Sequence, residues 1–173
     1  NNWINEREIE LKKLGFEFTH FAEFAWTYME PEEGKYDFKW LDDALSIAEK
    51  EGLKVILCTP TPTPPAWMGD KYPEIYLVDS KGNRRQHGNR ANISVTNKKY
   101  REFTAKIVAE LGKRYGKNKN IIGWQIDNEP LSTEDFSPSA RTAFQIWLKA
   151  KYGTIEKLNT EWVGSFWSTR YSN

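Results

Sequence analysis

The chain has 173 residues, and its 25 Lys and Arg against 24 Asp and Glu give a formal net charge of +1. This length allows one domain with a sizeable core, and the balanced charge argues against a nucleic-acid-binding protein, which usually has a basic excess. No apolar run approaches the roughly 20 residues that a membrane helix needs. The single cysteine, Cys58, excludes a small fold held by internal disulfides. We therefore expect no nucleic-acid or membrane partner.

Along the chain, residues 4–14 are predicted to form a helix, because apolar positions recur at helical spacing before Gly15. A strand over 16–24, a turn over 31–34 and a helix over 37–51 follow, and the apolar run 54–58 is typical of a buried parallel strand. The alternating prolines of 59–65 exclude both a helix and a central strand there, so a long loop is expected.

The remaining elements continue the same alternation. A helix marked by Tyr100, Phe103 and Ile107 is predicted to end near Gly116. A strand over 121–126 follows, and Ser137-Pro138 begins a helix that ends before Gly153. The order α-β-α-β-α-β-α predicts an α/β fold with a parallel sheet. Because no glycine-rich phosphate motif follows a strand, nucleotide-binding versions of this fold lose support.

The ends of the predicted strands are where a site is expected, since parallel βα proteins bind ligands at the carboxyl ends of their strands. These ends are 23–26, 59–67 and 127–130, and in the third an apolar strand leads directly into Asp127-Asn128-Glu129. A carboxyl group beside an amide, buried against aromatics, suits the general acid that glycosidic bond cleavage requires. A purely structural role, in which Asp127 and Glu129 only cap the next helix or pair with a nearby arginine, explains the pattern about equally well.

Several motifs in order along the chain resemble one known family. They are Leu14-Gly15-Phe16, Glu23-Phe24-Ala25-Trp26, Glu30–Phe38, the proline-rich segment from Thr59 to Trp67, Tyr72-Pro73-Glu74, Trp124–Glu129 and Phe166-Trp167-Ser168. The chain resembles the retaining β-galactosidases of glycoside hydrolase family 42 over essentially its whole length. The proline-rich segment together with Asn128-Glu129 makes the match specific, because an Asn-Glu pair alone ends the same strand in many barrel glycosidases.

The resemblance implies part of a (β/α)₈ TIM barrel, roughly strands two to four with their helices, with residues 1–173 as the N-terminal half of the catalytic barrel. It implies a retaining hydrolase of terminal non-reducing β-D-galactosides whose acid/base is Glu129. It also places Asn128 on the sugar 2-hydroxyl, Arg90 at the galactosyl ring and Trp167 at the wall of the pocket. The family's nucleophile, a glutamate that ends strand seven, has no match in this chain.

Two other functions stay open at this point. The same barrel with a different specificity, for a β-glucoside, a β-mannoside or an α-L-arabinoside, fits these residues, because the groups that recognise the 4-hydroxyl mostly come from the missing half. A carbohydrate-binding protein that has lost catalysis is the second alternative. The chain starts Asn1-Asn2 without a methionine, so we expect both ends to lie inside a longer polypeptide. A targeting segment can then lie outside it, and only the resemblance favours a cytoplasmic protein and a homotrimeric parent.

A metal or another cofactor is not expected. Some family members bind zinc through a cysteine cluster, but the matching regions here, 90–94 and 130–134, contain no cysteine. Cys58 is alone, and His20 and His87 do not cluster. His20 is interpreted as a satisfied histidine, either in the core or in the layer of residues behind the site. Glu23 is expected to pair with a neighbouring arginine rather than with the sugar. For Trp67, packing under the proline-rich loop is as reasonable an expectation as a role in binding.

Overall fold

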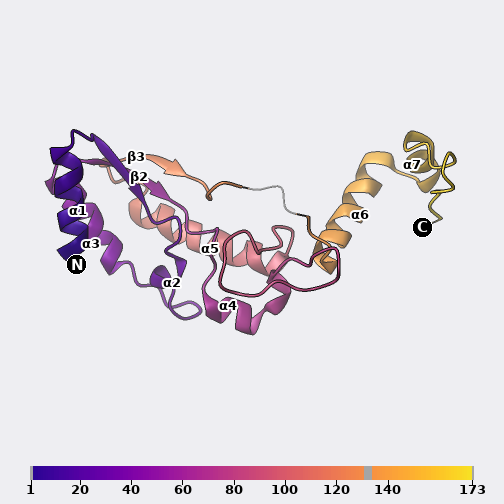
Figure 1. Ribbon diagram of the computed structural model, residues 1–173, viewed down its shortest axis with the longest axis horizontal. Coiled ribbons are helices and arrows are strands. Elements are labelled where there is room, and N and C mark those ends of the chain that lie inside the picture. The colour runs from indigo at the N-terminus through magenta and orange to yellow at the C-terminus, as the bar shows by residue number, and fades with distance from the viewer. Residues whose placement is uncertain (1, 131–133, 173) are drawn as a thin grey trace.

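The computed structural model describes residues 2–130 and 134–172. Its sheet has three parallel strands in the order β1 (Phe18–Phe21), β2 (Lys54–Cys58) and β3 (Ile121–Gln125). In the register, His20 lies opposite Ile56, and Ile56 lies opposite Gly123. The predicted parallel α/β arrangement is therefore confirmed, and the three strands end at the same edge of the sheet (Figure 1).

Three long helices lie along one side of the sheet (Figure 1). They are α1 (Asn2–Lys13), α3 (Lys39–Lys50) and α5 (Lys98–Tyr115). The core forms between β2 and two of these helices: Val55 and Leu57 of the strand are fully buried, as are Leu41 of α3 and Ile107 of α5. Fully burying one such side chain contributes about 1.5–3 kcal/mol to folding. None of the helices in the described ranges is long and apolar enough to span a membrane.

The chain also forms short elements that the helical spacing did not predict. These are α2 (Trp26–Met29), α4 (Ala66–Lys71), the 3₁₀ turn η1 (Pro73–Ile75) and α7 (Ile155–Glu161). Helices of four to seven residues show too few repeats for a period to be recognised. The predicted strand over 16–24 is shorter, because Ala22 has a φ of 92°, which ends the extended backbone after Phe21.

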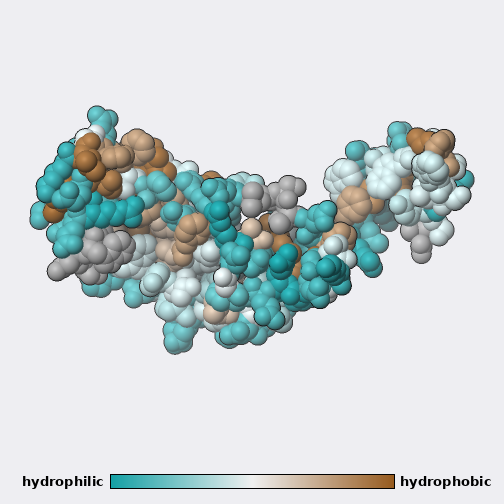
Figure 2. Space-filling model, in the orientation of Figure 1, coloured by the Kyte–Doolittle hydropathy of each residue, from teal (hydrophilic) through white to brown (hydrophobic). Residues whose placement is uncertain are grey.

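Helix α6 (Pro138–Tyr152) extends from the rest of the chain and leads to α7 (Figure 1). Its N-terminus is held in place, because Phe136 N donates to Val78 O at 2.8 Å and the Ser137 hydroxyl accepts from Ala140 N at 3.2 Å. None of its residues is buried, although Phe144, Ile146 and Trp147 are large and apolar. Figure 2 shows hydrophobic patches here and near the strands, where Ile122 is 57% exposed. Such faces are the ones that neighbouring barrel elements normally cover.

Residues 1–173 expressed alone are expected to aggregate or to dimerise, because both the open sheet edges and these apolar faces meet water. Sedimentation velocity at several concentrations checks this. A monodisperse 20.2 kDa monomer that melts cooperatively contradicts the expectation and removes the argument that the chain needs the rest of a barrel.

Candidate active site

A cavity of about 270 Å³ opens at the carboxyl ends of β2 and β3. Its walls come from three segments: the loop after β2, the loop before α5 and the residues after β3. The lining residues include Thr61, Pro62, Arg90, Ile93, Tyr100, Asp127, Asn128 and Glu129. The structure therefore brings together three of the four predicted site residues, namely Arg90, Asn128 and Glu129.

Glu129 and Arg90 form an ion pair in this cavity. Arg90 Nη2 lies 2.7 Å from Glu129 Oε2, and the two side chains are 45% and 63% exposed. Pairs this exposed contribute little net stability, so the contact mainly orients the two groups. The pairing with an arginine, which the sequence left open for Glu129, is therefore present in the structure. It lies inside a cavity of a size that holds a small ligand.

Asn128 is oriented from both sides. Gln125 Nε2 donates to Asn128 Oδ1 at 3.1 Å, and Asn128 N donates to Asp127 Oδ1 at 2.8 Å. The side-chain oxygen is therefore tied to the end of β3, which fixes the direction in which the amide nitrogen points.

Within residues 2–130 and 134–172, Asp127 neither caps the next helix nor pairs with an arginine. It bridges the two loops. Thr61 Oγ1 donates to its Oδ2 at 2.6 Å, and Asp127 N donates to Thr59 Oγ1 at 2.8 Å. The buried Tyr100 hydroxyl donates to Thr61 O at 2.7 Å, and burial, together with the charge of Asp127, raises the pKa of Tyr100 to about 12. Tyr100 thus remains a neutral donor, and the network holds the loop after β2 against the loop after β3.

The backbone is strained around this cavity. Ala91, Asp127 and Glu129 have φ values of 59°, 60° and 46°, a region that non-glycine residues seldom adopt. Such outliers persist only where the surroundings enforce them, and they concentrate at functional sites. The hydrogen bonds around Asp127 are the enforcing contacts on the β3 side.

Replacing Asp127 by alanine is expected to lower the free energy of unfolding by about 1–3 kcal/mol, because it removes the partners of Thr61 and Asn128 N and leaves alanine in a left-handed conformation. Urea unfolding of the full-length protein measures this loss. Asp127→Asn is the matched control, since asparagine tolerates the same φ and keeps one acceptor oxygen, and it should lose less. Equal stability of Asp127→Ala and wild type contradicts the bridging role.

The two candidate tryptophans have different positions. Trp67 Nε1 donates to Glu30 O at 2.8 Å, and its ring meets Phe103 edge to face with the centroids 5.3 Å apart. Trp67 is therefore partly buried and packs against the core. Trp167 is 79% exposed, meets Phe166, and does not line the cavity. Helix α6 leads the chain away from the cavity before Trp167 is reached (Figure 1). Within the described residues Trp167 therefore forms no wall of this pocket, and its expected role stays a prediction.

A second polar group lies at the ends of β1 and β2. Glu23 pairs with His20, with Oε1 and Nδ1 3.9 Å apart, and not with an arginine as expected. Cys58 Sγ lies 3.8 Å from the same His20 nitrogen, and burial, with a contribution from Glu23, raises the pKa of the thiol to about 12. The premise that Cys58 is alone is therefore wrong. His20 and Cys58 are 38 positions apart in the chain and meet only through the parallel pairing of β1 and β2, which spacing along the chain does not display.

The family model of the β-galactosidases of glycoside hydrolase family 42 matches residues 1–173. The chain belongs to glycoside hydrolase family 42. A β-galactosidase of a Thermus species is 44% identical over 94% of this chain and 26% of its own length. One from Thermus thermophilus is 42% identical over 98% of the chain and 27% of its own length. The family 42 chain thus spans about a quarter of the length of these curated relatives.

Solved structures agree with this assignment. The β-galactosidase of the psychrophilic Marinomonas ef1 superposes with a TM-score of 0.94 at 35% identity, over 100% of this chain and 27% of its own. The β-galactosidase of Bacillus circulans sp. alkalophilus superposes with a TM-score of 0.93 at 32% sequence identity, over 100% of this chain and 26% of its own. These family 42 neighbours are TIM barrels, so the predicted part of a (β/α)₈ barrel is confirmed. The catalytic domain of a Paenibacillus polymyxa β-amylase, at 18% identity and a TM-score of 0.64, shares the fold alone.

Proposed function

We propose that residues 1–173 are the N-terminal half of the catalytic barrel of a retaining β-galactosidase, with Glu129 as its acid/base. The observation on which this rests is the position of Glu129. In a chain of family 42, its carboxylate lies at the carboxyl end of β3 in a cavity shared with Asn128 and Arg90. This is the edge of the sheet at which barrel enzymes place their catalytic groups.

The proposed reaction has two steps. First, Glu129 gives its proton to the glycosidic oxygen while a second carboxylate attacks the anomeric carbon, so the carbon–oxygen bond breaks and a galactosyl-enzyme forms. Then Glu129 takes a proton from water while the water oxygen attacks the anomeric carbon, so the bond to the second carboxylate breaks and galactose is released. A retaining enzyme needs the two carboxyl groups about 5–5.5 Å apart. The nucleophile has to come from polypeptide outside this chain, consistent with the uncovered faces of the sheet and α6.

Asn128 and Arg90 are proposed to bind the sugar. The amide of Asn128, with its oxygen held by Gln125, is suited to donate to the 2-hydroxyl, a contact that strengthens in the transition state. Arg90 has several N–H donors, one of which contacts Glu129 in the free protein. When a sugar hydroxyl accepts from this donor instead, the guanidinium of Arg90 separates from Glu129. Acid catalysis requires this separation, because Glu129 must hold a proton before it can give one to the substrate.

The test of this function is a substrate panel on the full-length protein that contains this chain. We expect 4-nitrophenyl β-galactoside to be cleaved with kcat/KM roughly 100-fold or more above the β-glucoside and β-mannoside, because a site that pairs with one hydroxyl arrangement rejects its epimers. A preference for the glucoside, the mannoside or the α-L-arabinoside contradicts the substrate assignment. Binding of galactosides without cleavage of any of them contradicts the enzyme assignment and favours a carbohydrate-binding protein.

A further inference from the structure

The side chains of His20, Glu23 and Cys58 converge on one point at the ends of β1 and β2. Cys58 Sγ lies 3.8 Å from His20 Nδ1, which lies 3.9 Å from Glu23 Oε1, and the three ligand atoms are all within 4.8 Å of one another. Cys58 is fully buried, the Glu23 side chain is 21% exposed and that of His20 is 55% exposed. The proposed reaction uses none of these groups.

The strand pairing explains why the three groups meet. His20 lies opposite Ile56 in the parallel register, and Cys58, two residues further along β2, projects from the same face as Ile56. Ala22, with its φ of 92°, turns the backbone directly after β1 and so brings Glu23 back beside His20. The convergence is therefore built by the sheet and one tight turn, not by a flexible loop.

The His20–Glu23 separation of 3.9 Å exceeds that of an ordinary N–H···O hydrogen bond, whereas the Cys58–His20 separation of 3.8 Å is within the longer range of a hydrogen bond to sulfur. Both separations are also close to the spacing of ligands around one ion. With metal–ligand bonds of about 2.0–2.3 Å, neighbouring ligand atoms of a tetrahedral zinc site lie about 3.3–3.6 Å apart. The separations of 3.8 and 3.9 Å need a contraction of a few tenths of an ångström, and the Cys58–Glu23 pair, which lies within 4.8 Å, needs at most about 1.3 Å.

We propose that His20, Glu23 and Cys58 bind a divalent cation of the zinc type. One imidazole nitrogen, one thiolate and one carboxylate are the mixed ligand set that this borderline-soft ion accepts. On binding, the S–H bond of Cys58 breaks, its proton passes to solvent and the sulfur–metal bond forms. The thiolate and the carboxylate then neutralise the two positive charges of the ion.

The fourth ligand position is left for water or for a group from elsewhere in the full-length protein. The site differs from the cysteine clusters of some family members, because the matching regions 90–94 and 130–134 contain no cysteine. It joins the ends of two neighbouring strands, β1 and β2, so the ion would cross-link this part of the sheet.

The test is a Co²⁺ titration of the full-length protein after treatment with a chelator. We expect saturation with thiolate-to-cobalt charge-transfer absorption and the visible bands of a tetrahedral site, both removed by excess Zn²⁺. Cys58→Ser should abolish the charge-transfer band. His20→Gln and Glu23→Gln should weaken binding roughly tenfold or more, since even the loss of an outer partner of a ligand costs that much. His87→Gln is the control, because it removes the chain's other histidine, which lies outside the group, and it should leave the spectrum unchanged.

The proposal is overturned if Cys58→Ser keeps the wild-type cobalt spectrum and affinity, or if the wild-type protein shows no charge-transfer band at saturating Co²⁺. Circular dichroism of each variant checks its folding. If Cys58→Ser does not fold, His20→Gln and Glu23→Gln decide, and wild-type affinity in both overturns the site. None of these outcomes depends on glycosidase activity, so they are separate from the test of the proposed function.

Discussion

Replacing Glu129 by alanine is expected to lower kcat about 10²–10⁴-fold on galactosides with a poor leaving group, such as lactose or methyl β-galactoside, because the departing oxygen then has to leave without a proton. With a good leaving group such as dinitrophenolate the first step needs little acid assistance. The second step still lacks its base, so the galactosyl-enzyme accumulates and KM falls together with kcat. Steady-state kinetics on the two classes of substrate measure this contrast.

A matched control for this experiment is Glu49→Ala, which removes an exposed glutamate from α3, far along the chain from the cavity. It should leave kcat and KM unchanged for both substrate classes. An equal loss of activity for both classes in Glu129→Ala indicates a general defect of the site and not a missing proton donor. Full activity of the variant removes Glu129 from the mechanism.

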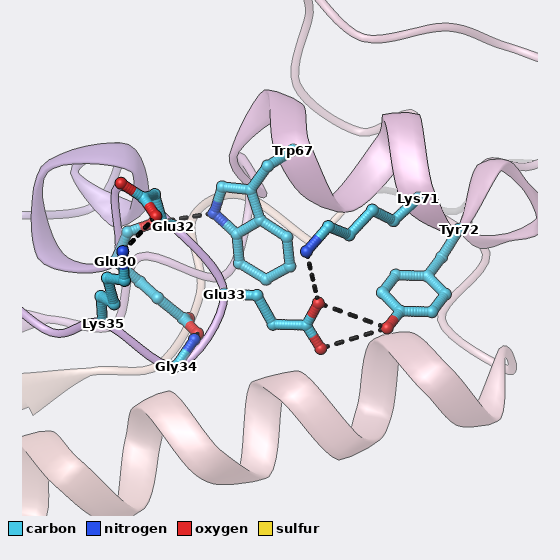
Figure 3. Close-up of polar contacts among 8 residues, drawn as sticks. All are labelled: Glu30, Glu32, Glu33, Gly34, Lys35, Trp67, Lys71 and Tyr72. Carbon is cyan, nitrogen blue, oxygen red and sulfur yellow. Dashed lines mark hydrogen bonds and ion pairs between the residues drawn. The ribbon is translucent and has the colours of Figure 1, made fainter.

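The largest effect on stability is expected at Glu30. This residue is only 1% exposed, and its carboxylate accepts from Trp26 Nε1 at 2.8 Å and from Gly34 N at 2.9 Å. Its carbonyl accepts from Trp67 Nε1, so this residue also places the tryptophan under the proline-rich loop (Figure 3). In Glu30→Ala two donors lose their partner. With about 1–3 kcal/mol for each unsatisfied buried group, we expect a loss of about 2–5 kcal/mol in the free energy of unfolding.

Glu33, in the same loop, is the control for this variant. It accepts from Lys71 Nζ at 2.9 Å and from the Tyr72 hydroxyl at 3.1 Å (Figure 3), but this contact is open to solvent. Exposed ion pairs add little net stability, so Glu33→Ala should melt close to wild type. Denaturant unfolding of both full-length variants makes the comparison. A loss at Glu33 as large as that at Glu30 contradicts the role given to burial.

The sequence predicts helices and strands well where neighbouring residues in the chain determine them. The apolar run 54–58 forms β2, and Ser137 accepts from Ala140 N at the start of α6 as its capping position predicts. Strand β1 is shorter than predicted because the turn at Ala22 has no residue-type signal: alanine seldom adopts a φ of 92°. The surrounding fold imposes that conformation.

The candidate site shows the same division. Asn128 and Glu129 are adjacent in the chain, so a motif displays them directly, and Arg90 meets them in the cavity. The bond from Thr61 to Asp127 joins residues 66 positions apart, and the contact of His20 with Cys58 joins residues 38 apart. Such contacts become visible only once strand order and register are known, because no periodicity along the chain encodes which residues a parallel pairing brings side by side.

The most direct test of the central claim is azide rescue of Glu129→Ala with an activated aryl β-galactoside. Azide needs no base to attack the anomeric carbon, so it should restore turnover of the accumulated galactosyl-enzyme. The account predicts β-galactosyl azide as the product, identified by the anomeric proton signal in NMR spectra. An α-galactosyl azide, or no rescue at any azide concentration, contradicts the assignment of Glu129 as the acid/base of a retaining β-galactosidase.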